Sequence, residues 1–140
     1  MKQAVIAVVL QDGKLLAIQR GPAVPYAGHW APPSGTIEPG ETQAQAVVRE
    51  MAEELGLEVE PLAKVWECPT DDGRYTLHWW TARPLSSELR LDPGEVNAAR
   101  WVTPEEFLAL EPIFEGDREF VAEVLPALRG GAADPRRRER

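Results

Sequence analysis

The chain has 140 residues, a net charge of −8, 44% hydrophobic residues and a single cysteine. This length and composition fit one globular domain with its own core, and they exclude a disordered or fibrous protein. The negative charge argues against general affinity for nucleic acid, and the lone Cys68 excludes an internal disulfide and a cysteine-based zinc site. No apolar run is long enough to span a membrane. We therefore expect a cytoplasmic protein.

The chain opens with a predicted β-hairpin. Residues 3–10 and 14–20 are rich in β-branched and apolar residues, and the Asp12-Gly13 pair between them is typical of a two-residue hairpin turn. Residues 21–41 are rich in proline and glycine, so we expect a loop with at most short extended pieces.

A helix is predicted over residues 43–55. Thr42 can cap its start, with Gln45 three residues later completing a capping box, and Gly56 can end it. At about 100° per residue, five apolar residues share one stripe that we expect to pack into the core. They are Ala44, Val47, Val48, Met51 and Leu55.

The second half of the chain alternates predicted strands and helices. Residues 57–68 and 74–82 read as strands joined by a "TDDG" turn, and residues 98–102 as a further strand. Thr103, followed by Pro104 and Glu106, marks the start of a second helix. A third helix is expected at about 117–128.

This order predicts an α+β fold in which helices cover a mixed sheet. We expect one domain over residues 1–128, followed by a flexible, arginine-rich tail over residues 129–140.

Three acids gather on one flank of the predicted 43–55 helix. Glu50 and Glu54 are i, i+4 neighbours and Glu53 lies beside both, so their like charges repel one another. A bound Mg²⁺ or Mn²⁺ explains the cluster, because hard oxygen ligands without cysteine or histidine suit these ions. Arg49 can pair with Glu53 or reach back to Glu41. The alternative is a solvated acidic helix face.

The residues before and within this helix decide between the two interpretations. Gly35, five residues, Glu41, seven residues and then Arg49-Glu50-Met51-x-Glu53-Glu54-x-Gly56-Leu57 form one ordered pattern. It resembles the Nudix box of the Nudix hydrolase family at every defined position. Ser34 is a departure, since the family commonly has a second glycine before Gly35.

The resemblance implies an α/β/α sandwich that uses Mg²⁺ or Mn²⁺ to hydrolyse a nucleoside diphosphate linked to another moiety. It implies Glu53 and Glu54 as principal metal ligands, and Glu50 as a further ligand or the base that activates water. The Gly35 carbonyl would be another ligand, and Arg49 and Glu41 would form a pair that orients the catalytic carboxylates.

Four residues outside the box are candidates for the same site. Arg20 either binds a phosphate or is a solvated strand end, and Trp30 either anchors the loop by packing or stacks on a base. Glu95 lies where the family often supplies an extra ligand or general base, and is otherwise a surface acid. Tyr75 lies at a distance from the box where dinucleoside polyphosphate cleavers carry a stacking tyrosine; otherwise it pairs across a hairpin.

The favoured substrate is a dinucleoside polyphosphate or a (deoxy)nucleoside triphosphate. The partner is thus a small molecule, with no nucleic acid and no membrane, and the family resemblance allows a homodimer. One competing hypothesis is a Nudix-like binding module without catalysis. Such a module would be expected to have lost one or more of the box acids, whereas Glu50, Glu53 and Glu54 are all present here. Another is diphosphate isomerisation, which needs a cysteine in the cleft, whereas Cys68 lies at a predicted strand end.

Overall fold

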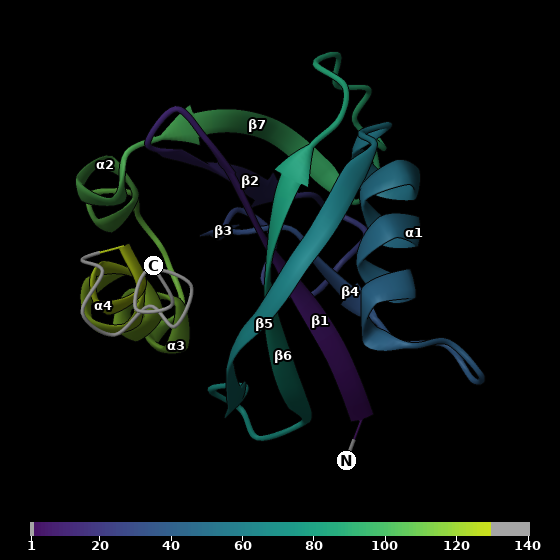
Figure 1. The fold of residues 1–140 in the computed structure, drawn as a ribbon, viewed down its shortest axis with the longest axis horizontal. Helices are drawn as coiled ribbons and strands as arrows, with labels where there is room; N and C mark the ends of the chain where they lie inside the picture. The colour runs from purple at the N-terminus through teal and green to yellow at the C-terminus, as the bar shows by residue number, and fades with distance from the viewer. Residues whose placement is uncertain (1, 130–140) are drawn as a thin grey trace, which may run out of the picture.

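The computed structural model describes residues 2–129, so the predicted tail lies, from residue 130 onward, outside the described part of the chain (Figure 1). The predicted first hairpin is present as β1 (Lys2–Gln11) and β2 (Lys14–Arg20). Asp12 and Gly13 have φ values of 53° and 77°. Positive φ at both central residues is what a type I′ turn requires, and this turn matches the twist of the paired strands.

The strands form one mixed sheet of seven. The order is β3-β2-β1-β6-β5, with β4 also paired to β1 and β7 to β2. The pair β1–β6 is parallel and the other pairs are antiparallel. The remaining bounds are β3 Trp30–Ala31, β4 Ser34–Thr36, β5 Val59–Pro69, β6 Tyr75–Pro84 and β7 Val96–Val102.

Helices cover both faces of the sheet (Figure 1). α1 (Gln43–Leu55) lies on one face, and α2 (Pro104–Leu108), α3 (Glu115–Glu119) and α4 (Leu125–Arg129) lie on the other. Alternate residues of β1 enter the two resulting cores, Val5, Ala7 and Val9 on the α1 side and Ile6 and Val8 on the opposite side. The predicted α+β class and α/β/α layering are confirmed. No helix within residues 2–129 is long and apolar enough to cross a membrane.

The core stripe predicted for α1 is partly wrong. Val48 is 42% exposed, whereas Ala46, left out of the stripe, is fully buried together with Val47, Met51 and Leu55. The buried arc is therefore turned toward the acids. At about 100° per residue, Glu50 and Glu54 fall between Ala46 and Leu55 inside this arc. Glu50 and Glu54 thus lie against the body of the protein, whereas Glu53 falls outside the arc and is exposed.

The third predicted helix begins earlier than expected and is not uniform. The Asp71 carboxylate accepts hydrogen bonds from the backbone N–H groups of Glu115 and Gly116, and so caps α3 from another part of the chain. A π-helical segment, Phe120–Val124, then separates α3 from α4, and the N–H of Leu125 bonds to the carbonyl of Phe120. This wider turn lies directly before Pro126, which has no N–H and whose ring disfavours a regular α-helical turn.

Candidate active site

A cleft of about 570 Å³ opens where β1, β2, β4 and α1 meet the β5–β6 turn and α3. Its wall is built from ends of elements, so side chains distant in sequence converge there. The residues predicted for the site that line it are Arg20, Gly35, Glu50, Glu54, Tyr75 and Glu95.

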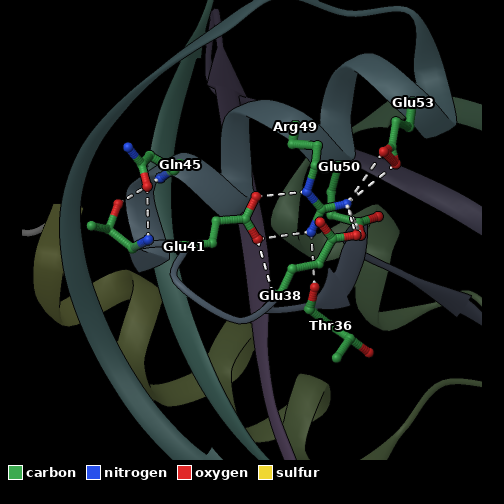
Figure 2. A network of polar contacts seen from close by, with 8 residues as sticks. Thr36, Glu38, Glu41, Gln45, Arg49, Glu50 and Glu53 are labelled. Atoms are coloured by element: carbon green, nitrogen blue, oxygen red, sulfur yellow. Dashed lines mark hydrogen bonds and ion pairs between the residues drawn. The ribbon is translucent and has the colours of Figure 1, made fainter.

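Arg49 ties the acids of the box together (Figure 2). Its Nε and Nη2 donate to the two Glu41 oxygens at 2.6 and 2.9 Å, and Nη2 also donates to the Thr36 carbonyl at 3.0 Å. Its Nη1 donates to Glu50 at 2.9 Å and to Glu53 at 3.2 Å. Both pairings considered for Arg49 from the sequence therefore occur. The bidentate contact holds the pKa of Glu41 down at about 2.

Glu50 and Glu54 are pressed together on the cleft wall. Burial raises the pKa of Glu54 to about 9, and a hydrogen bond to the Glu50 carboxyl adds to the rise. The Glu50 side chain is only 13% exposed, and it packs so closely on Gly35 that a Cβ there would overlap its carboxyl group. Two carboxyl groups in this position either share a proton or take up a cation.

Four predicted site residues lie outside the cleft lining, namely Glu41 and Arg49, described above, and Glu53 and Trp30. Glu53 has a side chain 57% exposed, and the hydrogen bonds it accepts come from Arg49. Trp30 joins the core on the α2 side, with the Arg100 guanidinium 5.7 Å from its ring centroid. These contacts favour the packing interpretation of Trp30 over base stacking.

Two further predicted residues, Arg20 and Glu95, face the acids from other elements. Arg20 ends β2, and its Nε donates to the Pro25 carbonyl at 2.6 Å. Burial lowers its pKa, while Glu54, Asp117 and Glu95 act in the opposite direction. Glu95 lies just before β7, and burial followed by the charges of Asp92 and Glu50 raises its pKa. A carboxylate with a raised pKa is a better base near neutral pH.

The donor set fits a hard divalent cation. Every candidate ligand is a carboxylate or carbonyl oxygen, the kind of ligand that Mg²⁺ and Mn²⁺ prefer. Within residues 2–129, however, no three acidic, histidine or cysteine side chains are already gathered as a metal cluster. The physical reason is visible in Figure 2, where the Arg49 guanidinium lies among Glu41, Glu50 and Glu53 and engages all three.

Sequence reasoning missed the acid at the far end of the cleft. Asp117 of α3 is 3% exposed, and its Oδ2 has no hydrogen-bond partner among residues 2–129. Burial raises its pKa to about 8, and the nearby Asp71 adds to the rise. Phe114 and the turn residue Arg74 line the same end. Nothing local marks Asp117 in the sequence, because an acid in the first turn of a helix is usually solvated.

Comparison with known proteins identifies the scaffold. A family model for the NUDIX domain matches residues 1–124. The chain belongs to the Nudix family. A putative 8-oxo-dGTP diphosphatase 2 of Mycobacterium tuberculosis is 35% identical to it over 142 residues, covering 99% of each chain. The CTP pyrophosphohydrolase of Escherichia coli is 37% identical over 114 residues, covering 77% of this chain and 80% of the relative.

Solved structures agree with the Nudix fold. The solution structure of the E. coli ORF135 protein has a TM-score of 0.72 at 33% identity, and covers 96% of this chain and 94% of its own. The MutT NUDIX hydrolase of Burkholderia pseudomallei has a TM-score of 0.77 at 26% identity, and the match covers 88% of this chain and 97% of the Burkholderia chain. The chain is thus a Nudix hydrolase, a class that generally uses divalent metal ions.

Proposed function

We propose that this Nudix hydrolase is a Mg²⁺-dependent pyrophosphohydrolase that cleaves a (deoxy)nucleoside triphosphate by attack of water on phosphorus. The carrying observation is the pair of Glu50 and Glu54 carboxyl groups, pressed together beside Gly35 on a cleft wall. Two relatives are named for triphosphate substrates, 8-oxo-dGTP and CTP. This favours a nucleoside triphosphate over a dinucleoside polyphosphate.

The residues that would hold the metal are Glu50, Glu53, Glu54 and the carbonyl of Gly35. Bound there, Mg²⁺ or Mn²⁺ supplies charge neutralisation of the phosphate oxygens and a lowered pKa of water. Glu50 can act as a ligand through Oε2, because Arg49 holds only its Oε1. Both oxygens of Glu53 accept from Arg49 Nη1, so Glu53 would have to turn away to act as a ligand. The two contacts of Arg49 with Glu41 do not depend on Glu53.

The protein groups around the metal ligands have separate tasks. Arg20 lies where it can bind a phosphate, its charge facing the acids across the cleft. The proton of the attacking water goes to a carboxylate, either Glu95 or one of the box acids Glu50 and Glu53. The raised pKa of Glu95 makes it a stronger base than an ordinary carboxylate.

The far end of the cleft suits a nucleobase. Tyr75 and Phe114 offer aromatic surfaces there, and base–aromatic stacking tolerates any base. Asp117, neutral below its raised pKa of about 8, presents both a donor and an acceptor. Such a group can pair with the polar edge of a base.

The competing functions have less support. An inactive binding module has no reason to keep Glu50, Glu53 and Glu54 together, where their charges repel one another. Diphosphate isomerisation needs a cysteine in the cleft, but Cys68 lies outside its lining, and burial raises the pKa of its thiol. The dimer and the cytoplasmic location expected from the sequence stay predictions.

A substrate panel tests the proposal. Nucleoside triphosphates, dinucleoside polyphosphates and nucleotide sugars are incubated with Mg²⁺ or Mn²⁺, and the products are identified by mass. We expect a nucleoside monophosphate and pyrophosphate from a triphosphate. Glu54→Gln and Glu53→Gln should each lower kcat by at least about 10²-fold, whereas Glu58→Gln, an exposed acid beyond the helix, is the matched control. Metal-independent turnover, or full activity in both site variants, would reject the proposal.

A further inference from the structure

The loop between β2 and β3, residues 21–29, crosses the cleft and is fastened on both sides. On one side the N–H groups of Gly21 and Ala23 donate to the carbonyls of Glu95 and Gly94, each at 2.8 Å. The approach is close, since a Cβ on Gly21 would lie 2.6 Å from the Gly94 carbonyl oxygen. The loop therefore starts firmly attached to the segment that carries Glu95.

The other fastening is a single long-range contact. The Tyr26 hydroxyl donates to Asp72 Oδ2 at 2.8 Å, across 46 positions of sequence. Asp72 lies in the β5–β6 turn, where its Oδ1 accepts from the Thr70 hydroxyl at 2.7 Å and from the Arg74 N–H at 3.0 Å. These bonds hold the pKa of Asp72 down at about 2, so the acceptor stays charged.

Tyr26 is also the outer member of an aromatic group. Its ring lies edge-on to Phe114 at 5.2 Å and to His29 at 5.5 Å, and His29 lies 4.6 Å from Phe114. Tyr26 nevertheless remains 47% exposed and has a φ of 60°, which is unusual for a residue with a side chain. A large, half-exposed ring is thus attached to a backbone with a positive φ, a conformation that the contacts of Tyr26 must stabilise.

Tyr26, Asp72 and Phe114 line the cleft together with Tyr75 and Asp117, and the contacts of Tyr26 with Asp72 and Phe114 mark one end of it. We propose that Tyr26 is a specificity-determining residue whose ring forms the outer wall against the nucleobase, and that Asp72 is the positioning residue that holds this ring in place. This inference rests on the proposed function, because it assigns the base of the nucleotide to that end. The phosphates lie at the other end, by the box.

The test measures binding of the two halves of the substrate separately. Equilibrium binding of CMP and dGMP, and of pyrophosphate with Mg²⁺, is measured by calorimetry for the wild type, Tyr26→Phe, Asp72→Ala and the double variant. Tyr26→Phe keeps the ring and leaves the β5–β6 turn intact. We expect each single variant to weaken binding of the better-bound monophosphate about 3–10-fold, the range of one lost hydrogen bond. The double variant should bind the monophosphate with the same affinity as either single variant, because both substitutions remove the same hydrogen bond.

We call the hydrogen bond between Tyr26 and Asp72 the clamp. Further variants separate its effect from a general loosening of the fold. Tyr26→Ala, which removes the ring, should weaken monophosphate binding by at least about 10-fold. Asp72→Asn should bind the monophosphate with an affinity within about twofold of the wild type. Its amide can donate to the Tyr26 hydroxyl while its oxygen keeps the turn contacts. Pyrophosphate affinity and kcat should change less than about twofold in all variants, so that the loss appears in KM for the triphosphate.

The outcomes are distinguishable. Unchanged monophosphate binding in Tyr26→Phe and Asp72→Ala, additive losses in the double variant, or a parallel loss of pyrophosphate binding would overturn the clamp, even if the enzyme cleaves triphosphates as proposed. Conversely, a wild type that binds monophosphate with the expected variant pattern but cleaves no triphosphate would reject the proposed function and leave the clamp standing. Absence of monophosphate binding by the wild type would overturn the clamp, while the substrate panel alone decides the proposed function.

Discussion

Arg49→Lys tests whether the arginine orients the metal ligands or merely neutralises them. Lysine keeps the charge but loses the fork that joins Glu41 at 2.6 and 2.9 Å and the Thr36 carbonyl at 3.0 Å. Lysine can replace at most one of these three bonds, and losing the other two, at about 1–1.5 kcal/mol each, gives roughly 2–3 kcal/mol of lost stability. For a chain of this size, that lowers Tm by about 6–12 °C.

The same substitution has a sharper consequence for metal binding. If Arg49 is an orienting residue anchored on Glu41, its loss should weaken Mn²⁺ binding by about 10–100-fold, as is typical when a residue supporting a ligand is removed. If Arg49 is instead a competitor of the metal for Glu50 and Glu53, its replacement should leave affinity equal or higher. Calorimetric titration of Mn²⁺ and thermal denaturation measure the two effects.

A matched control comes from the surface. Arg83 pairs with Glu60 between β6 and β5, and both side chains are exposed. Arg83→Lys should change stability by less than about 1 kcal/mol and leave Mn²⁺ affinity unchanged. Wild-type or tighter Mn²⁺ binding by Arg49→Lys would refute the orienting role.

Three further predictions follow from the site. Gly35→Ala should lower activity at least about 10²-fold, because its Cβ would displace the Glu50 carboxyl, whereas Gly40→Ala, whose Cβ meets nothing, should act on stability alone. Asp117→Asn should flatten the dependence of stability on pH. With a folded pKa of about 8, above its unfolded value, Asp117 makes the wild type lose stability as pH rises from about 4 to 8, so urea denaturation curves should diverge over that window in favour of the variant. Glu95→Gln should lower kcat by about 10²-fold and remove the fall in rate at acidic pH; unchanged profiles would assign the base to the box.

The features that the sequence predicts well are those set by neighbouring residues. The Asp12-Gly13 turn and the capping box of Thr42 and Gln45 occur as expected, because each depends on a few consecutive backbone groups. The grouping of Glu50 and Glu54 follows in the same way from helical spacing. These local signals were enough to predict the fold class and the position of the box helix.

The features that were missed depend on contacts between distant segments. α3 begins at Glu115 because Asp71, 44 residues earlier, caps it. Asp117 lines the cleft because the Asp71 carboxylate holds the start of α3 beside it, and the exposed Val48 reflects how α1 is rotated on its neighbours. Helical periodicity gives the spacing of side chains but not the direction in which the helix faces.

The Tyr26–Asp72 contact has the same origin. Its two partners lie in different loops, and neither has a sequence signal beyond its own turn. Trp30 illustrates the reverse case, since an aromatic residue in a loop beside the box was a candidate for stacking on a base. Its packing with Arg100 is apparent only once β3 and β7 lie on either side of β2.

The most direct measurement is anomalous diffraction from crystals soaked in Mn²⁺, with Glu54→Gln crystals treated alike. A metal peak should appear in the wild type among the oxygens of Glu50, Glu53 and Glu54 and the Gly35 carbonyl, with the Glu53 carboxylate turned from Arg49 toward it. The variant should have a weaker peak or none. A wild-type map with no Mn²⁺ at these oxygens, while the same crystals cleave a triphosphate, would contradict the account.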